Sequence, residues 1–354
     1  MKRKLLLIFF SLIFLFSISS CSSKRKSSNE QIIDNPTSKY IKYDTDDYSV
    51  PMPTNPSDKK VIYDCNNGFK YTSFLTSDNK VLKPTNDPTK IASTFVGWYS
   101  DEELTKEFNF NESYSKDLTI YAKYDTNIEE ISNLIYESTI LSNIRITSTF
   151  ANDDKYQGTK TEVIGSGVIF SASNTGYYAL TNHHVIYNEN NYIFSKYDVY
   201  DCYNNHYQGT VSYKDVDYDL AIIYFSRNNI DGVTVKEKLN DISFSNFIPK
   251  ENEKIVSIGN PHKIMNSISY GKYLGLKSYT ASQEYKDKSN INFDVLSHSS
   301  KIETGSSGGM VLDTNLRLIG INFASKVNDG EFEYAYAVPL SKVIEFILNF
   351  EEKD

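Results

Sequence analysis

The distribution of apolar and polar residues divides this 354-residue chain into three regions. Residues 5–16 form one unbroken, almost wholly apolar run. Residues 22–59 are rich in Ser, Lys, Asn, Asp and Pro and show little apolar periodicity, so they bury too little surface to offset the entropy of ordering. From residue 60 onward, short runs rich in Val, Ile and Tyr recur between turn residues, which predicts strands. The pattern therefore predicts a leader over 1–20, a flexible tether over 21–59 and a β-rich remainder.

The leader has the features of an export signal. Lys2, Arg3 and Lys4 precede the apolar run, which is shorter than the roughly 20 residues that a membrane span needs. The small residues before Cys21 resemble a bacterial lipobox, and this resemblance implies a lipidated cysteine at a new N-terminus. The alternative is an ordinary signal peptide that ends near a cysteine by chance. We expect an exported protein, anchored by lipidated Cys21 to the outer face of the bacterial cell membrane.

Residues 60–125 form a compact unit of four strands. Strand-like runs occur at 60–63, 69–75, 94–99 and 118–124, with Asn, Asp, Pro and Gly between them. The segments Phe95-Val96-Gly97-Trp98-Tyr99 and Leu118-Thr119-Ile120-Tyr121-Ala122-Lys123-Tyr124 resemble the Listeria–Bacteroides repeat, a β-grasp-like module of bacterial surface proteins. The alternative is an unrelated small β domain with an aromatic core. A single copy is present, and it carries no catalytic constellation.

The apolar pattern of residues 127–354 predicts a second folded unit. Ile128, Ile131, Leu134 and Ile135 have helical spacing, and a helix over 341–350 with Ser341 as its N-cap closes the chain. The strand-like runs between these helices favour barrels or a sandwich.

Composition narrows the classes of partner. The formal net charge is −8 and no basic stripe stands out, so we expect no nucleic-acid partner. Three cysteines are too few for a disulfide framework, and we expect Cys65 and Cys202 to be unpaired.

Three segments carry residues for nucleophilic catalysis. A strand-like run leads into His183 and His184, Asp219 opens a second run, and Ser307 sits among Gly305, Gly308 and Gly309 ahead of a third. Serine needs a histidine to take its proton and a carboxylate to orient that histidine. The glycines permit a sharp turn whose N–H groups converge on one point, as an oxyanion hole requires.

The order of these segments decides between two hydrolase classes. The residues 305–309 also satisfy the G-x-S-x-G pattern of α/β-hydrolases, in which the histidine follows the serine. Here every histidine precedes Ser307, so an esterase or lipase of that fold is excluded (histidines 183, 184, 206, 262 and 298). A zinc site at the histidine pair is not expected, because no further ligand lies at helical spacing. We expect neither a metal nor a cofactor, and we interpret the remaining histidines as structural or surface residues.

The same segments resemble the HtrA (DegP-like) branch of trypsin-like peptidases, over about residues 135–345. The motifs that carry the resemblance are Gly165-Ser166-Gly167, Leu180-Thr181-Asn182-His183-His184-Val185, Asp219-Leu220-Ala221, Ile258-Gly259-Asn260-Pro261, Gly305-Ser306-Ser307-Gly308-Gly309 and Leu318-Ile319-Gly320-Ile321-Asn322. The resemblance implies a mainly β fold of two six-stranded barrels with the active site between them. It assigns His184 as base, Asp219 as orienting acid and Ser307 as nucleophile. His183 is left as a neighbour, since successive strand residues face opposite ways.

The resemblance also implies where a peptide would bind. The backbone N–H groups of Gly305 and Ser307, assisted by Ser306, form the oxyanion hole. A substrate strand would pair along 320–324. The pocket for the residue before the cut would be lined by five residues: Lys301, Ile302, Gly320, Ile321 and Asn322. Ile302 and Ile321 favour a shallow pocket for small aliphatic residues; the rival interpretation has Lys301 selecting Asp or Glu.

We therefore expect a surface serine endopeptidase that acts on proteins or peptides in quality control or processing, by way of an acyl-enzyme. The chain ends at Asp354, so we expect none of the PDZ domains that usually follow the peptidase in HtrA proteins. The alternative function is an inactive peptidase fold that serves as a surface adhesion or scaffold protein.

Overall fold

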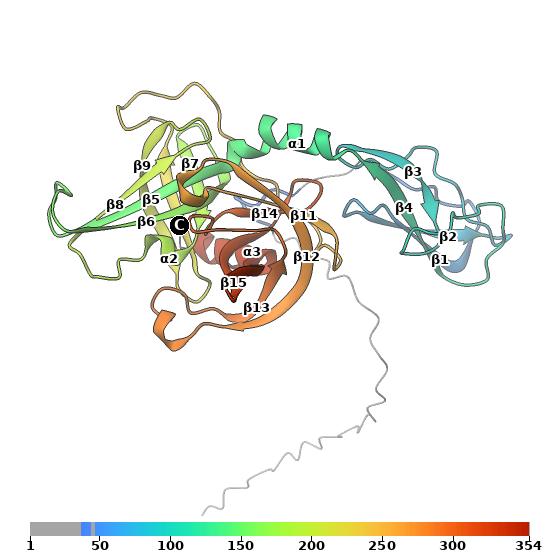
Figure 1. Ribbon diagram of the computed structural model, residues 1–354. Helices are drawn as coiled ribbons and strands as arrows, with labels where there is room; N and C mark the ends of the chain where they lie inside the picture. The colour runs from blue at the N-terminus through green and yellow to red at the C-terminus, as the bar shows by residue number, and fades with distance from the viewer. Residues whose placement is uncertain (1–36, 44–46, 354) are drawn as a thin grey trace, which may run out of the picture. The chain divides into compact units, whose positions relative to one another are not determined.

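The computed structural model describes residues 37–43 and 47–353, and its regular structure is mainly β (Figure 1). The leader and Cys21 lie outside the described residues. Among the residues that are described, no helix is long and apolar enough to cross a membrane.

The first sheet confirms the four strands expected between residues 60 and 125. It contains β1 (Pro56–Asp64), β2 (Lys70–Thr76), β3 (Ser93–Tyr99) and β4 (Leu118–Thr126) in the order β2-β1-β4-β3. β1 and β4 pair in parallel, whereas the outer pairs are antiparallel. The sheet packs on an aromatic core in which Trp98 meets Tyr63 edge to face at 5.5 Å.

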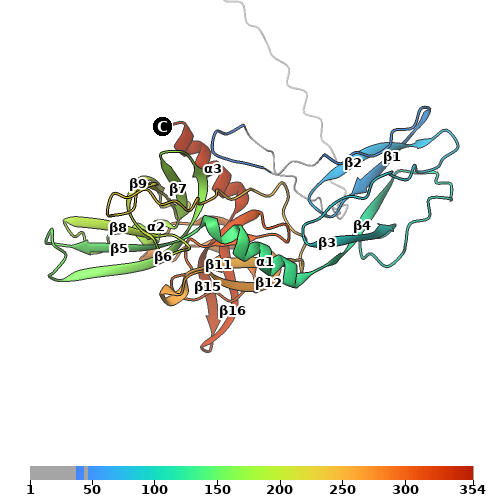
Figure 2. The same ribbon diagram turned by 90° about the horizontal axis from the view of Figure 1, so that it is seen from above.

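Two closed six-stranded barrels follow, in green to yellow and in orange to red (Figures 1 and 2). Barrel 1 is closed in the order β10-β7-β6-β5-β8-β9, and barrel 2 in the order β11-β12-β13-β16-β15-β14. This confirms the expected mainly β, double-barrel fold. The strands of barrel 1 are β5 (Asn143–Ala151), β6 (Lys160–Ala172), β7 (Gly176–Thr181), β8 (Phe194–Tyr200), β9 (His206–Asp215) and β10 (Leu220–Ser226). Those of barrel 2 are β11 (Lys254–Gly259), β12 (Ser267–Thr280), β13 (Asn292–His298), β14 (Met310–Leu312), β15 (Leu318–Asn328) and β16 (Glu331–Pro339).

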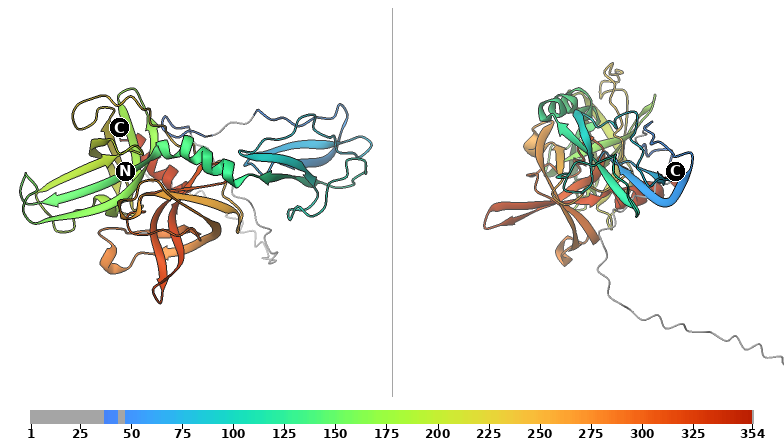
Figure 3. Two further views of the ribbon diagram at one scale, coloured as in Figure 1. Left: turned by 45° about the horizontal axis from the view of Figure 1, so that its top comes forward. Right: turned by 90° about the vertical axis from the view of Figure 1, so that its right-hand side faces the viewer.

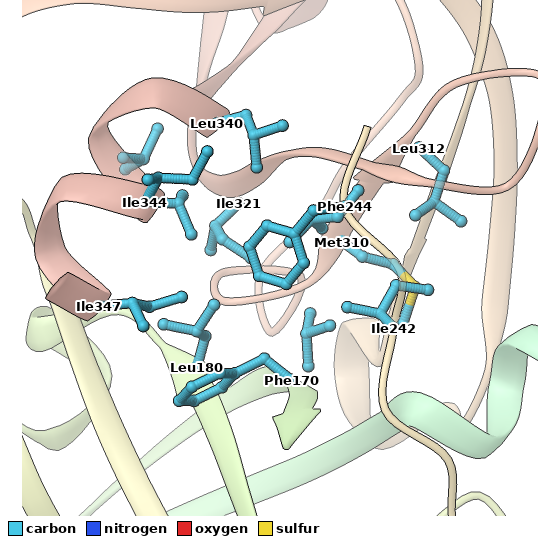
Figure 4. Packing of buried hydrophobic residues seen from close by; sticks show 14 of the residues in the cluster. Phe170, Leu180, Ile242, Phe244, Met310, Leu312, Ile321, Leu340, Ile344 and Ile347 are labelled. Atoms are coloured by element: carbon cyan, nitrogen blue, oxygen red, sulfur yellow. The ribbon is translucent and has the colours of Figure 1, made fainter. Parts of the chain in front are cut away.

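The largest apolar core lies between the barrels and includes the last helix. Figure 4 shows Phe170 and Leu180 of barrel 1 facing Ile321 of barrel 2, with Ile344 and Ile347 of α3 (Leu340–Glu351) closing one side. Since each fully buried aliphatic or aromatic side chain contributes about 1.5–3 kcal/mol, this shared core fixes one barrel against the other. Residues of the two barrels that lie near this core are therefore held in a fixed arrangement.

Two helices flank the barrels, and both were expected from the sequence. α1 (Ile128–Glu137) leads from β4 to the short 3-10 helix η1 (Thr139–Ser142) ahead of β5 (Figure 3). The Asn127 side chain caps α1 by accepting from the N–H groups of Glu129 and Glu130. The start of α3 differs from the prediction, because Pro339 is its N-cap and Ser341 lies inside the first turn. Further short helices are α2 (His183–Ile186), η2 (Pro261–Lys263) and η3 (Gln283–Tyr285).

Part of the predicted tether is packed rather than free. Tyr40 and Ile41 are buried, and the Tyr40 ring lies 5.4 Å from Phe350 and 5.9 Å from Phe170. The N–H of Phe244 also donates to Lys42 O. The sequence did not predict this packing, because the composition of residues 22–59 is polar overall. One aromatic and one aliphatic side chain are enough to attach the short segment to the apolar core.

Candidate active site

The histidine and the acid of the predicted triad meet at the end of barrel 1. β7 ends at Thr181, and the chain turns at Asn182 into α2, which carries His184. His184 Nδ1 lies 2.8 Å from Asp219 Oδ2, and the His184 N–H donates to Asp219 Oδ1 at 3.0 Å. Asp219 is fully buried, so its carboxylate accepts from Nδ1–H and leaves Nε2 of His184 as the free base.

Asp219 has a strained backbone that its neighbours stabilise. Its φ is +49°, a left-handed conformation that costs a residue with a Cβ about 1–2 kcal/mol. The Asn182 side-chain amide donates to Asp219 O at 2.9 Å, and the Asp219 N–H donates to Val216 O at 3.2 Å. The strain places the carboxylate under His184, and Asn182 is the side chain that holds it there.

His183 has a separate environment, although not for the reason that the sequence suggested. Both histidines lie on the helical turn of α2 and not at the end of a strand, so alternation of strand faces does not separate them. His183 Nδ1 instead contacts Lys288 O at 2.8 Å, and the side chain is nearly buried. Burial lowers the pKa of His183 below its usual value, which keeps this ring neutral.

The nucleophile loop requires glycine at two positions. Gly305 has φ +99° and Gly308 has φ +84°. A Cβ at Gly305 would lie 2.9 Å from Asn260 O, and one at Gly308 only 2.1 Å from Ser166 O. The loop therefore passes against β6 at a distance that only glycine permits, and this places Ser307 against barrel 1.

Two peptide planes orient the candidate oxyanion hole. The N–H of His262 donates to Thr304 O at 2.9 Å, so the N–H of Gly305, on the other side of that peptide, points the opposite way. The Ser306 N–H donates to Glu303 O at 2.9 Å within a turn and is not available to an oxyanion. The Ser306 backbone N–H is therefore not placed to assist as predicted, and the N–H groups of Gly305 and Ser307 remain the candidate donors.

The Ser307 hydroxyl is turned towards β15. Its Oγ donates to Phe323 O at 3.4 Å, and within residues 37–43 and 47–353 no hydrogen bond joins it to His184. The two are nevertheless neighbours: a Cβ at Gly165 would meet Val185, the residue after His184, at 2.6 Å and Ser307 O at 3.1 Å. A rotation about χ1 of Ser307 would release its hydroxyl from Phe323 O, and hydrogen bonds between catalytic groups often form only when a substrate is bound.

The five residues predicted to line the substrate pocket separate into two groups. Lys301 is exposed and pairs with Glu303 at 2.8 Å, and Ile302 lies beside it on the wall of a pocket of about 210 Å³. This pocket has a polar lining that includes the side chains of Ser257, Ser267, Ser269 and Ser306.

The other three predicted residues lie on β15, between β14 and β16. Ile321 faces the core between the barrels (Figure 4), so it does not narrow a substrate pocket as the sequence suggested. The alternation of the strand turns Asn322 into barrel 2, where its amide donates to Ser257 Oγ at 2.8 Å. Gly320 is buried between its two partner strands. Beyond Asn322, β15 pairs only with β16, which leaves the edge beside Phe323 unpaired within the described part of the chain.

The side chains of the remaining histidines have partners other than Asp219 and Ser307. His206 Nε2 lies 2.6 Å from Asp198 Oδ1, and His262 Nε2 lies 3.4 Å from a Glu303 oxygen at the surface. His298 is buried in barrel 2 with its Nε2 2.9 Å from Asn322 Oδ1. Burial lowers the pKa of His298 to about 4. Within the described residues, no three His, Cys, Asp or Glu side chains are placed to hold a metal ion.

Three polar residues that support the candidate site lie inside the sequence motifs, but the sequence alone did not reveal their roles. Asn182 holds the strained acid, while Ser166 and Asn260 contact the nucleophile loop. The sequence signal that could have identified them is a polar residue in an apolar context. Asn182 and Asn260 each come directly after an apolar strand, and Ser166 lies between two glycines in another.

Comparisons with known proteins agree with this fold. Residues 165–321 match the trypsin-like peptidase domain, and residues 60–123 match the Listeria-Bacteroides repeat domain. The first match includes His184, Asp219 and Ser307. The fold is also similar to the crystal structure of the Rv3671c protease from M. tuberculosis in its active form, with 20% identity, a TM-score of 0.50, and coverage of 63% of this chain and 87% of that chain.

Curated relatives include HtrA proteins of several bacteria. The Serine protease Do-like HtrA of Bacillus subtilis is 25% identical over 226 residues, which are 63% of this chain and 47% of that protein. The Serine protease HtrA-like of Staphylococcus epidermidis is 29% identical over 231 residues, which are 62% of this chain and 37% of that protein. The Probable periplasmic serine endoprotease DegP-like of Buchnera aphidicola is 26% identical over 263 residues, 70% of this chain and 51% of that protein. The chain thus spans about half or less of these relatives.

Proposed function

We propose that this protein is a serine endopeptidase that cuts proteins or peptides through Ser307, His184 and Asp219. The observation that carries the proposal is the pairing of His184 with a fully buried carboxylate, beside a glycine-framed serine on the facing barrel. The trypsin-like and HtrA similarities support the same reaction class.

The reaction uses the described groups in sequence. His184 Nε2 takes the proton of Ser307 Oγ as that oxygen attacks the peptide carbonyl, and Asp219 stabilises the imidazolium that results. The N–H groups of Gly305 and Ser307 stabilise the oxyanion. His184 then donates its proton to the leaving amine, and water hydrolyses the acyl-enzyme in the reverse order. The substrate backbone pairs as a strand at the open edge of β15 near Phe323.

A fluorophosphonate probe tests the proposal, because it labels only a serine that the site activates. Wild-type protein should be labelled, and Ser307→Ala and His184→Ala should lose the label. Ser148→Ala is the control, since it removes a buried hydroxyl on β5 that has no hydrogen-bond partner among the described residues, and it should keep the label. If the wild-type protein is not labelled, the enzyme proposal fails and the inactive scaffold is favoured.

The proposal includes a location. Relatives with periplasmic names and the basic, apolar leader support export, and Cys21 is the proposed lipid anchor. Cys21→Ser should leave an uncleaved precursor or release the protein into the medium, whereas Cys202→Ser should fractionate with the membrane like the wild type. Equal membrane association of Cys21→Ser would contradict lipidation.

A further inference from the structure

Ser166 joins barrel 1 to the nucleophile loop of barrel 2. It lies on β6 between Gly165 and Gly167 and is fully buried. Its N–H donates to Ser307 O at 2.7 Å, and its hydroxyl donates to Gly305 O at 2.8 Å. One residue therefore binds the carbonyl groups of both residues whose N–H groups form the candidate oxyanion hole.

A second buried residue fixes the direction of the Ser166 hydroxyl. Asn260, at the end of β11, donates to Ser166 Oγ from its N–H at 2.8 Å and from its amide at 3.2 Å. The Asn260 amide also donates to Ile144 O at 2.8 Å, and its Oδ1 accepts from Asn143 Nδ2 at 2.9 Å. Because both acceptor positions of the hydroxyl are filled by Asn260, its proton is left for Gly305 O.

This bond acts on the loop at the point where it is least constrained. Gly305 has no side chain to restrict its backbone, and its N–H is useful only while the peptides on either side keep their orientation. His262 N–H anchors the preceding peptide at Thr304 O, and Ser166 anchors the following one at Gly305 O. The Ser306 N–H holds the other side of this second peptide through Glu303 O. Without the Ser166 hydroxyl, only that bond within the turn resists a rotation that would carry the Gly305 N–H out of the oxyanion hole.

We propose that Ser166 is a positioning residue, which holds the oxyanion hole open for catalysis from the opposite barrel before any substrate is bound. It touches neither substrate nor the reacting atoms and acts through Gly305 and Ser307. The proposal rests on the proposed function of Ser307 as nucleophile.

Ser166→Ala tests it, because this change removes the hydroxyl bond to Gly305 and keeps the backbone bond to Ser307. The kcat for a fluorogenic peptide should fall roughly 10- to 100-fold with little change in KM, as for an interaction made in the transition state. The rate of fluorophosphonate labelling should fall by a similar factor. In the labelled protein, the ³¹P chemical shift should move, since the phosphoryl oxygen occupies the oxyanion hole.

Ser148→Ala is the matched control. Ser148 is also fully buried in barrel 1, on β5, but its hydroxyl has no partner among the described residues. This variant should keep the wild-type kcat, labelling rate and ³¹P shift. If Ser166→Ala does not fold, Ser166→Cys keeps the volume and replaces a strong donor with a weak one, and it should show the same kinetic losses.

The outcomes separate this inference from the proposed function. Wild-type protein that reacts through Ser307, together with a Ser166→Ala variant of equal kcat and unchanged ³¹P shift, overturns the role of Ser166 alone. A fall in melting temperature of Ser166→Ala without those kinetic and spectroscopic changes also overturns it, since a merely structural serine would give that result. Wild-type protein that fails to react overturns the proposed function.

Discussion

The His184 half of the site belongs wholly to barrel 1, whereas the Ser307 half lies on barrel 2 and is held by residues of both barrels. His184 and Asp219 meet side chain to side chain, and Asn182, two residues before His184, supports the acid. The nucleophile loop is fixed almost entirely through its backbone, by Ser166 from the facing barrel and by His262 beside it. The histidine half can thus form once barrel 1 has folded, while the serine half depends on the contact between the barrels.

The largest test of this comparison removes one catalytic group from each half. Ser307→Ala and His184→Ala should each lower kcat by about five to six orders of magnitude, because the groups act as a unit. The double variant should be little worse than either single variant. The measurement is peptide hydrolysis with a Ser148→Ala control. Strong activity in His184→Ala with His183 intact would show that the wrong histidine was assigned as base.

A glycine-to-alanine substitution where the nucleophile loop touches barrel 1 should lower stability and activity more than the same substitution at an exposed turn. In Gly308→Ala the new Cβ would meet Ser166 O at 2.1 Å at a φ of +84°, so we expect a loss of unfolding free energy of about 3 kcal/mol or more and almost no activity. Gly232→Ala is the control, with φ +77° and open space around the Cβ, and should lose about 1 kcal/mol with normal activity. Equal losses of unfolding free energy in both variants would mean that the positive φ alone causes the loss. The close approach of the nucleophile loop to barrel 1 would then contribute nothing.

Local patterns in the sequence predicted one half of this arrangement better than the other. The strands and both long helices follow from the spacing of apolar residues along the chain. The double barrel and the His184–Asp219 pair were implied by the resemblance to HtrA peptidases, which short motifs beside strands carry. The side to which Ile321 points depends on the register of β15, and the hydrogen bond of the Ser306 N–H depends on the orientation of its peptide. Residue types alone specify neither. Ser166 was visible in its glycine motif, but its partner lies 139 residues away, so only the folded structure joins them.

The buried histidine of barrel 2 makes folding sensitive to acid. His298, inside barrel 2, has its pKa lowered to about 4 by burial, against about 6.5 for an unfolded chain. Between these values the unfolded chain binds a proton that the folded chain does not, so folding stability falls as the pH falls from 6.5 towards 4. In urea unfolding, the wild type should lose about 2 kcal/mol more than His298→Gln between pH 7 and pH 5, at about 1.4 kcal/mol per pH unit. Equal losses in both proteins would show that His298 is not responsible.

The smallest expected effect concerns Lys301, which lies on the serine half near the candidate substrate pocket. Its ammonium is 2.8 Å from Glu303, and about 65% of the side chain is exposed, so its charge is balanced and turned towards solvent. Exposed pairs of this kind contribute about 0–1 kcal/mol. Lys301→Ala should therefore change the preferred residue before the cut very little.

Peptide-library profiling of the wild type and of Lys301→Ala measures this directly. Lys326→Ala is the control, because Lys326 is also exposed and pairs with Glu333 at 3.1 Å on the hairpin of β15 and β16. Both variants should give the wild-type profile. A wild-type preference for Asp or Glu that disappears in Lys301→Ala, but not in Lys326→Ala, would show that Lys301 points into the pocket and selects the substrate by charge. In that case the serine half of the site would determine specificity as well as the nucleophile, and the aliphatic assignment would be wrong.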